Sequence, residues 1–129
     1  MKKELIICII IVILIIVMNV ITQNYTRNCV ENITDNLYKL EEAILADKVN
    51  TDDVYQRMDN IDKDWHKFQD NLAFYIEHDE LEKVETKISD IKGLEKVEKY
   101  DDMLPQIEES IFLLEHIRDK HILTARNIF

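Results

Sequence analysis

The residues of this sequence best suited to chemistry are histidines and carboxylates that gather in two short segments. The candidates are His78, Asp79 and Glu80 in the first segment and Glu115, His116, Asp119 and His121 in the second. Imidazole nitrogen and carboxylate oxygen are ligands for zinc and other divalent ions. The spacing argues against a site, however, because His116 and His121 are five residues apart and do not share a helical face.

Other catalytic chemistry is sparse. Neither the zinc motif HExxH nor a Cys-x-x-Cys pair occurs, and the two serines, Ser89 and Ser110, lack a glycine-flanked turn. The single glycine, Gly93, excludes a glycine-rich nucleotide loop. We therefore expect no enzyme, no cofactor and no metal. The histidines and carboxylates are interpreted as a solvated polar cap at one end of a helical structure. A metal site formed by His78, Asp79, Glu80, His116 and His121 is the alternative.

Composition indicates the elements that must position these residues. The chain has 129 residues with one Gly and one Pro, too few turn residues for a sandwich or barrel of short strands. The prediction is an all-α fold. The formal net charge of −10 excludes nucleic acid as a partner attracted by the overall field.

Residues 5–21 form a nearly uninterrupted apolar run, with Asn19 as the polar exception. A spanning helix needs about 17–25 predominantly apolar residues, so the run predicts a single-pass anchor in the cell membrane. Lys2 and Lys3 precede it and should stay in the cytoplasm by the positive-inside rule. The predicted organisation is a cytoplasmic N-terminus at residues 1–4, a signal-anchor helix at residues 5–21 and an extracytoplasmic domain at residues 22–129. A cleaved signal peptide is the alternative, but the run is long for one and no small-residue cleavage site follows it.

Beyond the apolar run, apolar residues recur at steps of three and four, which predicts four amphipathic helices. The stripes are Val30, Ile33, Leu37, Leu40 and Ile44; Met58, Ile61, Trp65, Phe68, Leu72 and Tyr75; Leu81, Val84, Ile88, Ile91 and Leu94; and Leu104, Ile107, Ile111, Leu114 and Ile117. Short connections favour an antiparallel four-helix bundle, with an open array of helical hairpins as the alternative. No Gly or Pro precedes Gly93, so the membrane helix is expected to continue directly into the first stripe.

Helix ends are marked by capping residues. Asn50 should cap the second helix, and His78-Asp79-Glu80 should cap the third. Gly93 weakens the third helix or ends it early. The antiparallel order places the junction of helices two and three beside the end of helix four, at the end that faces the membrane.

Several side chains have alternative interpretations. The aromatic residues Trp65, Phe68, Phe74 and Tyr75 are expected in the core, and the alternative is an apolar groove for a ligand or partner helix. The charged run Asp62-Lys63-Asp64 is expected to be solvated surface, and His66 to be exposed. Cys29, outside the membrane while Cys8 lies within it, is either an inert thiol or pairs between chains.

The second half resembles domain-of-unknown-function family 4363, found in clostridia and related Gram-positive bacteria. The resemblance is carried by Trp65, the run LAFYIEHDELEKVE from Leu72 to Glu85, the run IEESIFLLEHI from Ile107 to Ile117, and the closing Asn127-Ile128-Phe129. It implies a membrane-anchored helical protein outside the cytoplasmic membrane and a companion of multi-pass membrane proteins. It implies no activity and no catalytic residues.

Three hypotheses about function follow. The first is an interaction or scaffold subunit for another membrane protein. The tail from His121, with Ile122, Leu123, Ile128 and Phe129, either packs on the membrane-near end of the bundle or contacts the partner. The second is a sensory or small-ligand-binding domain with a ligand between its helices. The third is metal binding through the histidine and acidic residues. A homo-oligomer is compatible with each.

Overall fold

The computed structural model describes the backbone of residues 1–128 and the side chains of residues 1–122. In this part the chain forms four helices and no strand. They are α1 (Lys2–Leu45), α2 (Thr51–Leu72), α3 (His78–Lys96) and α4 (Tyr100–Ile128). The prediction of an all-helical chain is confirmed. Of the tail residues proposed to pack or contact a partner, the side chains of 123–129 lie outside the described residues.

Helix α1 is unbroken over 44 residues, a length of about 66 Å at a rise of about 1.5 Å per residue. The expected continuation of the apolar run into the first stripe is therefore confirmed. Within the described residues, α1 is the one helix long and apolar enough to cross a membrane, and its apolar window is not buried by the rest of the chain. We call residues 5–21 the apolar segment and residues 22–122 the packed region.

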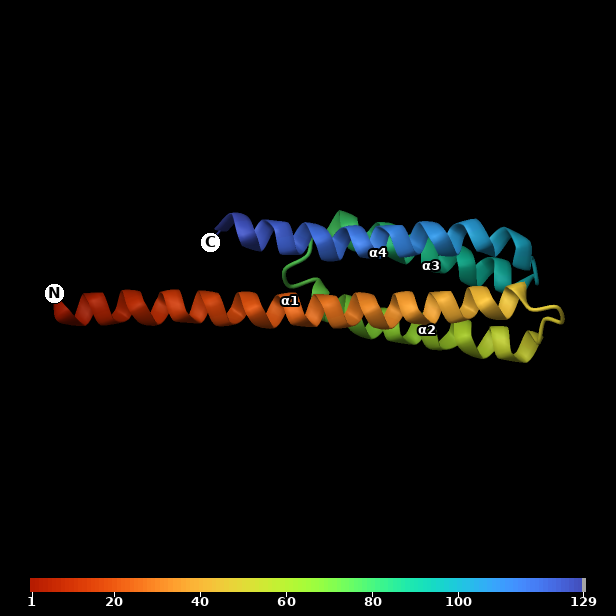
Figure 1. The fold of residues 1–129 in the computed structure, drawn as a ribbon, viewed down its shortest axis with the longest axis horizontal. Coiled ribbons are helices and arrows are strands. Elements are labelled where there is room, and N and C mark those ends of the chain that lie inside the picture. Colours follow the sequence, from red (N-terminus) through yellow and green to blue (C-terminus); the bar gives the residue numbers. More distant parts are fainter. Residues whose placement is uncertain (129) are drawn as a thin grey trace.

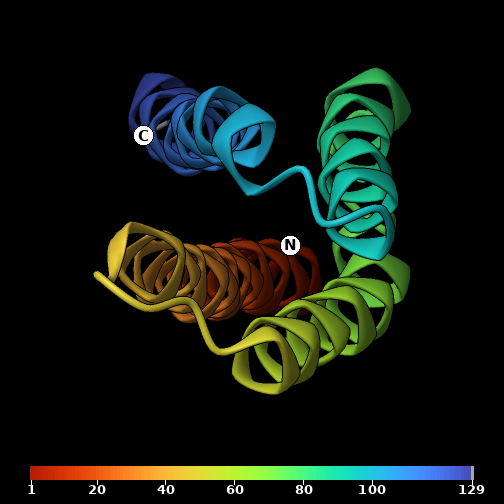
Figure 2. The same cartoon turned by 90° about the vertical axis from the view of Figure 1, so that its right-hand side faces the viewer.

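The four helices are arranged around a common core, one at each corner of a square (Figures 1 and 2). Consecutive helices contact each other, and α4 returns to contact α1. The α1–α2 and α3–α4 connections lie at one end, which we call the distal end. The α2–α3 connection lies at the other end, beside the place where α1 leaves the apolar segment (Figure 1). We call this second end the proximal end.

The core is formed by the predicted stripes. All five predicted residues of the first stripe are buried, as are most of those in the other three. Leu94 and Leu104 are only partly buried, as are the aromatic residues Phe68 and Tyr75. The core also contains Cys29, Val54 and Met103, which the stripes did not include.

The prediction for Phe74 is wrong. Its side chain is 86% exposed. Helix α2 ends at Leu72 and the chain then turns, so helical spacing no longer places Phe74 on the buried face. The backbone N–H groups of Phe74 and Tyr75 bond to the carbonyls of Asn71 and Leu72 at 3.3 and 3.1 Å. The turn therefore holds Phe74 out of the core.

The predicted capping residues are found at one helix start and not at the other. Asn50 caps α2 as predicted, since its side chain accepts a hydrogen bond from the Asp53 N–H at 3.2 Å. The predicted cap at His78-Asp79-Glu80 is wrong, because α3 begins at His78 and Glu77 occupies the cap position without a side-chain bond. The two acids instead lie in the first turn, where the helix dipole favours them.

The end of α3 lies beyond its glycine. Helix α3 continues past Gly93 to Lys96, so an early end does not occur. The turn comes at Glu98, whose φ of 55° is left-handed. The Lys99 N–H bonds to the Leu94 carbonyl and the Glu98 N–H to the Glu95 carbonyl, both at 3.0 Å. This is the Schellman pattern with Glu where Gly is usual.

Candidate functional site at the proximal end

The structure brings the two histidine-containing segments to the same end of the packed region, as predicted. Lys120 Nζ lies 3.3 Å from Glu80 Oε1 and 3.6 Å from Glu77 Oε1. The rings of Tyr75 and His121 have centroids 5.1 Å apart. The turn of α4 that carries Lys120 and His121 therefore packs against the α2–α3 connection.

These segments do not assemble a group of metal ligands. Over the described residues, no three His, Cys, Asp or Glu side chains are placed to hold a metal. His78 is exposed and its Nε2 lies 4.0 Å from Glu82. His116 is stacked on Phe112 with ring centroids 6.5 Å apart. Glu80 is engaged by the protein's own cation, Lys120, while Asp79 lines a groove on the other side of α3.

A different group of side chains meets at the proximal end, and we call Thr22, Thr26, Tyr75 and His121 the junction. The Thr22 carbonyl accepts hydrogen bonds from Thr26 Oγ1 at 2.7 Å and from the Tyr75 hydroxyl at 3.2 Å. The hydroxyls of Thr26 and Tyr75 lie 2.8 Å apart. His121 Nε2 lies 3.4 Å from Thr22 Oγ1. The junction thus ties α4 and the α2–α3 connection to the first turns of α1 beyond the apolar segment.

A second set of contacts supports the junction. Asn71 Nδ2 donates a hydrogen bond to the Tyr25 hydroxyl at 2.8 Å, and the Tyr25 ring meets Phe68 edge-on at 6.4 Å. Cys29 lies in the core below them, and burial raises the pKa of its thiol. A buried thiol of raised pKa is inert, so the structure favours this interpretation of Cys29 over pairing between chains.

Burial favours the neutral state of the junction. Desolvation raises the pKa of Tyr75. It also raises the pKa of Tyr25, because its effect is larger than the lowering caused by the Asn71 hydrogen bond. Desolvation also lowers the pKa of His121. Burial therefore disfavours the charged forms of both phenols and of the imidazole. A neutral, hydrogen-bonded group suits a position next to an apolar segment, where an unpaired charge would be costly.

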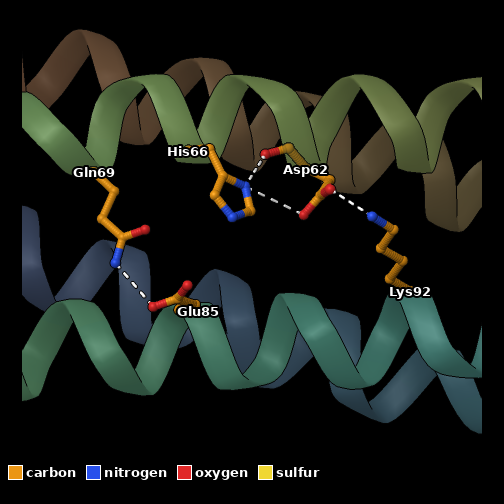
Figure 3. A network of polar contacts seen from close by, with 5 residues as sticks. All are labelled: Asp62, His66, Gln69, Glu85 and Lys92. Atoms are coloured by element: carbon orange, nitrogen blue, oxygen red, sulfur yellow. Dashed lines mark hydrogen bonds and ion pairs between the residues drawn. The ribbon is translucent and has the colours of Figure 1, made fainter.

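Polar side chains of α2 and α3 form an ion pair and a hydrogen bond between the two helices (Figure 3). Lys92 Nζ lies 2.7 Å from Asp62 Oδ2, and Gln69 Nε2 donates to Glu85 Oε2 at 3.0 Å. His66 is exposed, as predicted, and its Nδ1 donates to the Asp62 carbonyl at 2.7 Å. The expectation that Asp62 is solvated surface is wrong, because its largely buried carboxylate bridges the two helices.

A groove of about 970 Å³ runs between α3 and α4 on the outside of the packed region. Its walls include Lys83 and Lys87 from α3 and Pro105, Glu108, Phe112 and Leu113 from α4. The Phe112 side chain is 69% exposed. Phe112 was not predicted as a functional residue, although an aromatic residue off the apolar stripe of its helix was a signal for it.

Fold and site define an all-helical protein, over the described residues, in which an apolar N-terminal segment continues without a helix break into a packed region. The chain belongs to the family "Domain of unknown function (DUF4363)", whose model matches residues 20–128. The resemblance seen in the sequence is thereby confirmed. The match begins beside the end of the apolar segment, so the shared part is the packed region. No curated protein and no solved structure matches the chain.

Proposed function

We propose that this protein is a single-pass membrane protein whose packed region lies outside the cytoplasm and acts as an interaction or scaffold subunit for another membrane protein. The observation that carries the proposal is the unbroken course of α1 from the exposed apolar segment into the core. Such a helix fixes the packed region at a set height and angle above a membrane. That property serves an interaction module more than a freely moving binding domain.

Topology and architecture are part of the proposal. Lys2 and Lys3 favour a cytoplasmic N-terminus, so residues 1–4 lie inside and residues 22–129 outside. The contact of α4 with α1 supports an antiparallel four-helix bundle over an open array of hairpins.

Orientation can be tested by labelling a cysteine at the distal end. Leu45→Cys introduces an exposed thiol there, whereas Cys8 lies in the apolar segment and Cys29 in the core. A membrane-impermeant maleimide should label the variant in intact cells and leave the parent chain unlabelled. Labelling that requires permeabilised cells would contradict the proposed orientation.

An interaction role fits the polar chemistry of the packed region. The side chains suggested for metal binding are used in helix contacts or point to solvent, and the junction holds helices together. The groove between α3 and α4 lies open on the outside of the packed region, with exposed Phe112 in its lining. Exposed aromatic side chains in grooves are common anchors of protein interfaces. We therefore assign this groove as the contact surface for the partner.

Photocrosslinking in cells tests the assignment. A crosslinking amino acid replaces Phe112 in the groove, and the control replaces Tyr55, an exposed aromatic residue of α2. One recurrent membrane protein captured from position 112 and not from position 55 would support the proposal. Crosslinks from position 112 only to other copies of this chain would instead indicate a homo-oligomer and contradict the accessory role.

A sensory or ligand-binding role is the second candidate, and the size of the same groove favours it. A volume of about 970 Å³ is within the range of small-molecule sites. A ligand bound there would raise the melting temperature of the wild-type chain, and Phe112→Ala would reduce the rise. The same result for Tyr55→Ala would show that binding is elsewhere.

A further inference from the structure

We infer that the proximal corner between the apolar segment, the α2–α3 connection and α4 binds membrane lipid. A phospholipid acyl chain lies along α1, and Phe74 enters the interfacial layer of the bilayer. This inference rests on the proposed membrane anchor and adds a ligand class and a second point of membrane contact. It commits to lipid, with a partner helix or a second copy of the chain as the competing occupants.

The hydrogen bonds of the junction fix the height of the α2–α3 connection. The Tyr75 hydroxyl reaches the carbonyl of Thr22, the first residue beyond the apolar segment, at 3.2 Å. It also lies 2.8 Å from Thr26 Oγ1. If residues 5–21 cross a bilayer, the connection that carries Phe74 must lie at the bilayer surface.

Phe74 is presented outward at this level. Its side chain is the most exposed large hydrophobic one of the packed region, within the part of the chain whose side chains are described. The exposure is built into the backbone, because the Tyr75 and Ile76 N–H groups both bond to the Leu72 carbonyl, at 3.1 and 2.8 Å. Aromatic side chains are enriched at the membrane interface, where an apolar ring leaves water.

A groove of about 420 Å³ lies in the corner itself. Its lining includes the apolar side chains Ile11, Leu14, Ile15 and Met18 of the apolar segment. The polar residues Asn19, Thr22, Tyr75 and His121 complete the lining. Helix α4 extends past the α2–α3 connection beside α1 (Figure 1). Since four of these side chains belong to the segment that lipid must cover, the groove opens into the bilayer.

The length and lining of the groove suit a hydrocarbon chain. From Ile11 to Thr22 a helix advances about 16 Å, and four apolar side chains line the groove along this stretch. An extended acyl chain of a phospholipid can lie along such a stripe.

The polar end of the groove suits a lipid headgroup. Tyr75 and His121 stand where the acyl chain would meet the interface, and Lys120 and Glu77 lie beside them. The mixed charges of Lys120 and Glu77 do not select an anionic headgroup. Phosphatidylcholine is accordingly a sufficient probe.

Quenching by brominated lipid tests the position of Phe74. Full-length Phe74→Trp and the control Leu45→Trp, exposed at the distal end, are reconstituted into liposomes of phosphatidylcholine brominated near the carbonyl end of its acyl chains. Native Trp65 is buried and gives an unquenched reference. The fluorescence added by Trp at position 74 should be lost in brominated lipid, and that added at position 45 retained.

Flotation of the same samples distinguishes a failure of the membrane anchor from a failure of the interfacial placement of Phe74. Protein that does not float with liposomes would overturn the membrane anchor and hence the proposed function. Protein that floats, but in which position 74 is quenched no more than position 45, would overturn the interfacial placement of Phe74 alone.

Native mass spectrometry tests the groove. Wild-type chain released from phosphatidylcholine nanodiscs should retain a phospholipid. Leu14→Trp, which fills the groove, should lose it, whereas Ile13→Trp, outside the groove lining, should keep it. Equal retention by the two variants, or a protein dimer in place of the lipid adduct, would overturn lipid as the occupant.

Discussion

The two halves of α1 are made of similar residues and have opposite surroundings. Ile13 in the apolar segment is 54% exposed, and Ile33 in the packed region is 0% exposed. The apolar segment is apolar on every side, while residues 26–44 bury one face, with polar residues such as Glu31 and Asp35 on the other. Hydrophobicity alone therefore does not tell where an isoleucine lies, whereas its periodicity does.

The boundary between the halves is marked by hydroxyls. Thr22 and Thr26 are the residues to which the α2–α3 connection and α4 are tied, and no break in α1 accompanies the change of surroundings. A continuous helix carries orientation across this boundary, which a flexible linker would not. The following predictions test the contrast between the halves, beginning with the largest expected effect.

Charge in the apolar segment should release the protein from the membrane without unfolding it. The double variant Ile10→Arg with Ile13→Arg adds about 6–8 kcal/mol to the free energy of insertion, comparable with the gain from the apolar run. Tyr38→Arg with Tyr55→Arg, at exposed positions of the packed region, is the control. Membrane fractionation should find the first variant soluble and the control retained. Retention of both would contradict the anchor.

Truncating the same residue type in each half should give unequal losses of stability. Ile33→Ala removes buried methyl groups and should lower the free energy of unfolding by about 2–5 kcal/mol. Ile13→Ala, in the half exposed to its surroundings, should change it by less than about 0.5 kcal/mol. Denaturant titration in detergent, followed by Trp65 fluorescence, measures both. Similar losses would mean that the apolar segment packs on the chain.

The core was predictable because its signal is local. Steps of three and four correctly placed Ile33, Leu37 and Ile88 in the core, because the buried face of a helix recurs every 3.6 residues whatever packs against it. The end of α2 was not predictable, because Leu72 is followed by neither Gly nor Pro. Phe74 was misplaced for that reason.

The junction was not predictable for a different reason. Tyr75 meets Thr26 across 49 residues and His121 meets Thr22 across 99. Hydrogen bonds of this kind depend on the rotation of three helices about their axes, which spacing along one helix does not determine. The sequence did indicate that the same end would gather polar residues. It did not indicate that Lys120 would engage Glu80.

Removing the hydroxyl of Tyr75 should lower the free energy of unfolding and weaken the contact of the α2–α3 connection with α1. Tyr75→Phe deletes the donor to the Thr22 carbonyl and the contact with Thr26, at an expected cost of about 1–2 kcal/mol. Tyr55→Phe removes an exposed hydroxyl and should change stability by less than about 0.5 kcal/mol. Hydrogen exchange should accelerate near Thr26 in the first variant. Unchanged stability and exchange would show that the junction does not hold the helices.

Local helix propensity should matter in the packed region. Gly93 lies inside α3 on its exposed face, and a Cβ built there meets no atom within 4 Å. Gly93→Ala should therefore raise the free energy of unfolding by up to about 1 kcal/mol. Thermal denaturation measures the gain. A loss of stability would mean that the glycine serves a close contact.

Acidification should weaken the junction by a small amount. Burial lowers the pKa of His121, so between the folded and unfolded values the unfolded chain binds more protons. Stability is accordingly expected to fall as the pH drops through about 6.5, the ordinary value of histidine. His121→Gln should lack this component when the two chains are compared at pH 7.5 and 5.5. Identical pH dependence in both would contradict the burial of His121.

The most direct test of a single rigid helix across both halves is a distance measured along it. Spin labels are placed at native Cys8 and at Tyr38→Cys, both exposed, in a Cys29→Ala background and in nanodiscs. An unbroken helix separates these positions by about 45 Å. Pulsed electron resonance should then give one narrow distribution near that distance. A broad or shorter distribution would show that α1 bends at the boundary, and the packed region would no longer be fixed relative to the membrane.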